Sequence, residues 1–64
     1  MELYRILSLD YGTKKTGLAV TDPYRIIANP LCAIESSEIL SFIERYSKSE
    51  VVKIILVGMP RHLN

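Results

Sequence analysis

A chain of 64 residues with 48% hydrophobic and 23% charged residues has the composition of one small globular domain, and none of its apolar runs approaches the roughly 20 residues of a membrane-spanning helix. Its net charge of +1 argues against a strongly basic nucleic-acid-binding module, and its single cysteine, Cys32, excludes an internal disulfide. No signal-peptide pattern is seen at the first residues. We therefore predict a soluble, cytoplasmic protein in which residues 1–64 belong to a single domain.

The first two predicted elements are strands joined by a short turn. Apolar residues between Tyr4 and Asp10 form a run of strand length, and the turn signal Tyr11-Gly12-Thr13 follows it. A second run, Thr16 to Thr21, is small and β-branched and stops before Pro23, which cannot donate a ladder hydrogen bond. The short connection predicts an antiparallel pair.

A third strand and a helix come next. The apolar runs 26–28 and 31–34 flank Pro30, which predicts a strand with the proline at an edge or a bulge. The segment 35–38 offers a hydroxyl N-cap and acidic first-turn residues for a helix over residues 37–48. Cys32 is predicted to pack in the core, together with the apolar stripe of the helix: Ile39, Leu40, Phe42, Ile43 and Tyr46.

The last predicted element is a strand over residues 51–57. Its nearly continuous apolar character is typical of a strand that is buried on both faces and has neighbours on both sides. The order strand, strand, strand, helix, strand predicts an α/β fold with a mixed sheet of order 3-2-1-4, in which the last strand runs beside the first. The outer edge of the last strand is then exposed, and the sequence leaves open whether a homodimer covers it.

Asp10 is the main candidate for chemistry because it ends a buried strand at the sheet edge where ligands of open α/β sheets bind. Its carboxylate is a hard oxygen ligand, which predicts a metal site. The turn and the chain after the last strand supply candidate phosphate-binding residues: Gly12, Thr13, Lys14, Lys15 and Arg61. Arg61 and His62 are expected near Asp10. Asp22 is expected at the far end of the second strand, about 20 Å away.

A single carboxylate limits what this edge can do. Phosphodiester hydrolysis by two divalent ions needs several carboxylates around one cleft. The remaining acidic residues are predicted on the amino-terminal segment and on the helix or its flanks. Either the site is completed elsewhere, or the chain is not a complete enzyme.

Three sequence blocks resemble the YqgF family: Leu9–Pro23, Ile27–Leu31 and Ile55–Pro60. Its members are ribonuclease H-like proteins described as Holliday junction resolvases and as nucleases that mature the 5′ end of pre-16S ribosomal RNA. The resemblance implies a five-stranded sheet of order 3-2-1-4-5 and phosphodiester cleavage that depends on Mg²⁺ or Mn²⁺, with a ribosomal RNA precursor or branched DNA as substrate.

By position, the resemblance makes Asp10 the catalytic and metal-binding carboxylate of the first strand, and Gly12, Thr13 and Lys14 the signature turn. It also implies that residues 1–64 are the amino-terminal part of one ribonuclease H-like domain. The family's other acidic residues and its fifth strand would then lie outside the chain, so we expect little or no nuclease activity from these residues alone.

Two alternatives remain at this point. The pattern Asp10-x-Gly12-Thr13 on a strand, turn and strand also resembles the first phosphate loop of the actin-like superfamily, which would make the protein an ATP-binding phosphotransferase. The other alternative is a truncated fragment without catalytic function.

Overall fold

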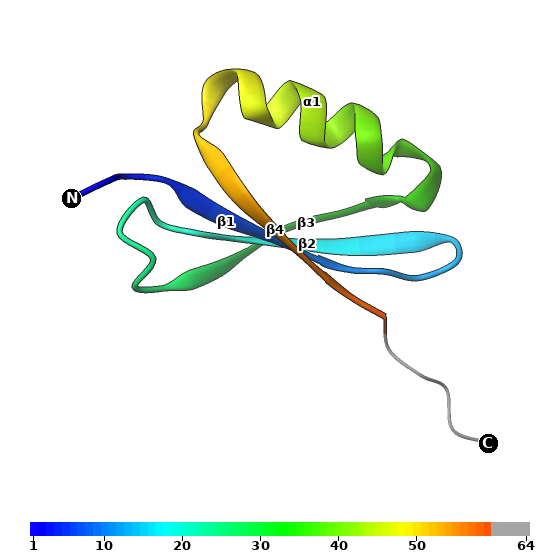
Figure 1. The fold of residues 1–64 in the computed structure, drawn as a ribbon. Helices are drawn as coiled ribbons and strands as arrows, with labels where there is room; N and C mark the ends of the chain where they lie inside the picture. The colour runs from blue at the N-terminus through cyan, green and yellow to red at the C-terminus, as the bar shows by residue number, and fades with distance from the viewer. Residues whose placement is uncertain (60–64) are drawn as a thin grey trace.

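The computed structural model of the chain describes residues 1–59. Its elements follow the predicted order (Figure 1): β1 (Arg5–Asp10), β2 (Lys15–Thr21), β3 (Ala28–Glu35), a single 3-10 turn η1 (Ser36–Glu38), α1 (Ile39–Ser49) and β4 (Val52–Gly58). The four strands form one sheet of order β3-β2-β1-β4. β2 pairs antiparallel with both β1 and β3, whereas β4 pairs parallel with β1. The predicted mixed α/β sheet is confirmed.

The helix covers one face of the sheet, as Figure 1 shows. Successive residues of a strand point to opposite faces, and those of β1 and β2 that point toward α1 form the buried core: Leu7, Leu9, Leu18 and Val20. The stripe predicted for the helix packs against this core through Ile39, Phe42, Ile43 and Tyr46. Leu40 was placed in that stripe wrongly, because it turns away from the sheet and is 82% exposed.

β4 is an edge strand within residues 1–59. Its apolar residues Ile54 to Val57 are 39% to 59% exposed, so the prediction of a strand buried on both faces is wrong for the part of the chain that the structure describes. The physical reason is that α1 packs over β1 and β2, and β4 has β1 as its sole neighbour in this sheet. The prediction of an exposed outer edge is confirmed. No helix within residues 1–59 is long and apolar enough to cross a membrane.

The third strand starts later than its sequence suggests. Ile26 and Ile27 were predicted within the strand, but their amides donate to the Asp22 carboxylate at 2.8 and 2.7 Å, which folds them into a turn. The strand begins at Ala28. Its proline lies on an edge strand and next to a register shift, where Ala19 pairs with Pro30 and Leu18 with Cys32. Both settings predicted for the proline are therefore present.

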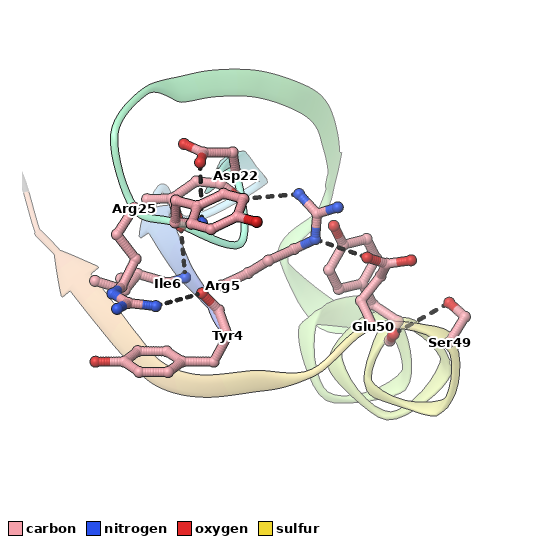
Figure 2. A network of polar contacts seen from close by, with 10 residues as sticks. Tyr4, Arg5, Ile6, Asp22, Arg25, Ser49 and Glu50 are labelled. Atoms are coloured by element: carbon pink, nitrogen blue, oxygen red, sulfur yellow. Dashed lines mark hydrogen bonds and ion pairs between the residues drawn. The ribbon is translucent and has the colours of Figure 1, made fainter. Parts of the chain in front are cut away.

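Polar contacts close the end of the sheet that lies opposite Asp10, and Figure 2 shows them. Arg5 forms an ion pair with Glu50 at 2.6 Å and donates to the carbonyl oxygen of Thr21 at 3.0 Å, so it ties the start of β1 to the ends of α1 and β2. Arg25 stacks over the Tyr4 ring at 3.9 Å and donates to the Tyr4 carbonyl oxygen at 3.2 Å. These contacts stabilise the sheet at one end, and Asp10 lies at the other end.

Candidate metal and phosphate site

Asp10 lies at the last position of β1, with its side chain exposed. In the ladder its Cα pairs with Gly17 of β2 on one side and with Gly58 of β4 on the other. The amide of Tyr11 donates to the carbonyl oxygen of Gly58 at 2.9 Å, which fixes the backbone just after the carboxylate. Asp10 therefore lies where the first and last strands end together, as predicted.

The two glycines keep the surroundings of Asp10 open. Paired residues of neighbouring strands point to the same face, so side chains at positions 17 and 58 would flank the carboxylate. A hollow of about 530 Å³ lies on this face, lined by Asp10 and mainly by small or apolar residues that include Ser8, Gly17, Ala19, Leu31 and Cys32. Cys32 is exposed, so its prediction as a core residue is wrong. Its register position opposite Leu18 lies in the edge strand, which the helix leaves uncovered.

The turn after Asp10 is held tightly. A Cβ on Gly12 would lie 2.5 Å from the carbonyl oxygen of Lys15, so a larger residue cannot occupy this position without a backbone shift. Close approach, rather than a positive φ, therefore explains why glycine is needed here.

Ser36 contacts this turn from the end of β3. Its hydroxyl donates to the Gly12 carbonyl oxygen at 2.5 Å, and its amide donates to the Lys14 carbonyl oxygen at 2.8 Å. The predicted hydroxyl N-cap of the helix is wrong, since neither η1 nor α1 has a side-chain cap. The hydroxyl that sequence reasoning assigned to the helix serves the turn instead. Its 24-residue separation from Gly12 leaves no local sequence signal for this role.

The candidate phosphate-binding residues differ in their positions and contacts around this turn. Thr13 and Lys14 are exposed at its tip. Lys15 begins β2 and forms an exposed ion pair with Glu35, at 3.8 Å, of the kind that is worth little energy in water. Its ammonium group is therefore free to exchange partners. Arg61 and His62 lie outside the described residues.

The Asp10 carboxylate could supply one ligand to a divalent metal ion, which would need further ligands. The exposed carboxylate oxygens are hard donors with open space beside them. Within residues 1–59, however, no three His, Cys, Asp or Glu side chains gather closely enough to hold a metal ion. Asp22 belongs to the opposite end of β2, as predicted, and the amides of Tyr24, Ile26 and Ile27 already occupy its oxygens. These backbone hydrogen bonds, the one from Ile27 above all, lower the pKa of Asp22.

Comparisons with known proteins give the family of the chain. A family model described as "RuvX: Holliday junction resolvase" matches residues 4–64. Relatives named "Putative pre-16S rRNA nuclease" are 48% identical in Christiangramia forsetii and 47% in Bacteroides fragilis, in each case over 60 residues that make up 94% of this chain. A relative of the same name in Flavobacterium johnsoniae is 45% identical over 60 residues. No solved structure gives a significant match.

The structure defines an α/β protein with a mixed sheet of order 3-2-1-4 and a carboxylate at the end of its first strand. Because the family model covers nearly the whole chain, the chain belongs to the RuvX family, which is also called YqgF. It spans 44% of the length of the first two relatives, so these residues correspond to less than half of such a protein.

Proposed function

We propose that the chain is part of a metal-dependent nuclease that cleaves phosphodiester bonds in structured nucleic acid. The observation that carries this proposal is Asp10, an exposed carboxylate at the end of β1 between two glycines, in a chain of the RuvX family. The names of the relatives favour a ribosomal RNA precursor as substrate, and the description of the family model favours branched DNA. With the former substrate the protein works in the cytoplasm. The family match also favours a nuclease over an actin-like phosphotransferase.

In this proposal Asp10 holds Mg²⁺ or Mn²⁺ through its carboxylate oxygens. The bound ion supplies a Lewis acid that stabilises charge on the phosphate oxygens. Thr13 and Lys14 contact the phosphate backbone from the exposed tip of the turn, and Lys15 does so after leaving Glu35. Arg61 is a further candidate for a phosphate contact. These residues position the backbone and carry no sequence information by themselves.

Residues 1–64 alone are expected to be inactive or nearly so. Two ions about 4 Å apart need several carboxylates, and no three His, Cys, Asp or Glu side chains gather within residues 1–59. The missing ligands would come from residues that correspond to the rest of the longer relatives.

A chimera tests this function directly. The 60 residues of this chain that match the Christiangramia forsetii relative would replace the corresponding segment of that protein, and cleavage of a pre-16S ribosomal RNA fragment and of a four-way DNA junction would be measured with Mg²⁺. We expect one of these substrates to be cut, and Asp10→Asn to abolish the cutting while Glu44→Gln, on an exposed position of α1, leaves it intact. Equal activity of the Asp10→Asn chimera would refute the assignment of Asp10.

A further inference from the structure

Ser36 holds both ends of the turn that follows Asp10. Its hydroxyl lies 2.5 Å from the carbonyl oxygen of Gly12, and its amide lies 2.8 Å from the carbonyl oxygen of Lys14. Since Ser36 follows β3, these bonds join the turn to a strand that is distant in the sequence and not paired with β1. The conformation of the turn therefore depends on a tertiary contact.

The protons of this contact can be assigned. A carbonyl oxygen can only accept, so the single hydroxyl proton of Ser36 goes to Gly12. The Oγ1 of Thr16 lies 2.7 Å from the same Ser36 oxygen, and Thr16 must then be the donor in that pair. Thr16 is fully buried, at 0% exposure, so its hydroxyl has no competing water. The result is a directed chain from Thr16 through Ser36 to the Gly12 carbonyl.

This chain fixes the direction of one backbone amide. The described residues contain no cis peptide bond, and in a trans peptide the carbonyl oxygen and the next amide hydrogen point in opposite directions. With the Gly12 carbonyl turned inward to Ser36, the amide of Thr13 is turned outward, at the exposed tip of the turn. An outward amide three residues after the Asp10 carboxylate is a donor suited to a phosphate oxygen.

We propose that Ser36 is a positioning residue of the nuclease site, which aims the Thr13 amide at the phosphate bound beside Asp10. Thr16 donates to the Ser36 hydroxyl and so keeps that hydroxyl directed at the Gly12 carbonyl oxygen. This inference rests on the proposed function. It adds to that function a specific phosphate donor and the two hydroxyl residues that orient it.

Nuclear magnetic resonance of the isotope-labelled chain tests the inference, with Mg²⁺ and a short RNA oligonucleotide as probes. In the wild type, RNA should shift the Thr13 amide signal. Ser36→Ala should move the apo signals of Gly12 and Thr13 and weaken RNA binding about three- to tenfold, the effect of one lost hydrogen bond. Ser36→Thr, which keeps the hydroxyl, should restore most of the affinity. Ser49→Ala is the matched control, since Ser49 also donates its hydroxyl to a backbone carbonyl, that of Tyr46, far from the turn.

A second variant keeps the test decisive if Ser36→Ala fails to fold. Thr16→Val retains the size of the buried residue and leaves Ser36 in place, and it should weaken binding about two- to threefold. If the wild type binds and both variants bind RNA equally well with an unchanged Thr13 shift, the inference is overturned while the proposed function stands. If the wild type binds neither Mg²⁺ nor RNA, or if Asp10→Asn binds as well as the wild type, the proposed function fails and the inference fails with it.

Discussion

Asp10 and Gly17 lie directly opposite each other in the β1–β2 ladder, and a Cβ on Gly17 would lie 3.7 Å from the Cβ of Asp10. That distance is an ordinary van der Waals contact, so the backbone here does not require glycine. What glycine provides is open space on the face that carries the carboxylate. Gly58 pairs with Asp10 on the β4 side, where an added Cβ would lie 3.6 Å from the Leu9 carbonyl oxygen.

The variant Gly17→Ala tests whether glycine is required for metal binding or for stability of the fold. A strand interior favours alanine over glycine by roughly 0.5–1 kcal/mol, so the variant should be as stable as the wild type or slightly more stable in urea denaturation. Its methyl group should crowd the coordination sphere at Asp10 and weaken Mn²⁺ binding severalfold in a calorimetric titration. Ala19→Ser, two residues along the same face, serves as the control. Unchanged Mn²⁺ affinity in Gly17→Ala would show that the open space is not used.

The Asp22 turn predicts a specific pH dependence of stability. Because the amides of Ile27, Ile26 and Tyr24 hold the pKa of Asp22 below its usual value of 3.8, the folded carboxylate binds a proton less readily than the unfolded one. Its stabilising contribution is therefore fully present above the unfolded-state pKa and is lost as the pH falls through the folded-state pKa.

We expect the unfolding free energy of the wild type to exceed that of Asp22→Asn by a constant amount near neutral pH, and the difference to shrink below about pH 4. Urea denaturation at a series of pH values measures this difference. Glu44→Gln, at an exposed position of α1, should show no such trend. A difference that stays constant down to the acid limit of folding would contradict the role given to the Asp22 carboxylate.

The outer edge of β4 predicts self-association of the isolated chain. The Gly58 carbonyl faces β1, where it accepts from Tyr11, and strand alternation turns the backbone groups of Val57 toward the open edge. An exposed apolar edge of this kind pairs with other strands. Sedimentation should therefore show larger species as concentration rises. Val57→Lys should weaken the association about tenfold or more, whereas Leu40→Lys on the helix should not. A wild-type chain that stays monomeric at all concentrations would refute this prediction.

Much of the fold follows from local patterns. Apolar runs and turn residues identify the four strands, and a crossover through one helix brings the last strand beside the first. Asp10 could be located because it ends such a run. The start of β3 was misjudged because Ile26 and Ile27 look like strand residues, and only the carboxylate of Asp22 takes their amides out of the ladder.

The burial of individual residues and the hydrogen bonds around the turn were harder to predict. The exposure of Cys32, Leu40 and the β4 residues depends on where the helix lies, which a periodicity does not specify. The segment 35–38 was expected to supply a hydroxyl cap for the helix, because a hydroxyl before a helix usually caps it, but the Ser36 hydroxyl has the carbonyl of Gly12 as its partner. The role of the fully buried Thr16 could not be predicted either, since nothing in a strand sequence marks a hydroxyl that meets another one from a distant segment.

The most direct test of the account is the location of Mn²⁺ on the chain, read from paramagnetic broadening of backbone amide signals. We predict that broadening is strongest at Tyr11, Gly17 and Gly58, the residues next to Asp10 or paired with it, and that Asp10→Asn abolishes it. Broadening centred on Asp22 or Glu2, or broadening around β1 that persists in Asp10→Asn, would contradict the claim that Asp10 is the metal-binding carboxylate of this protein.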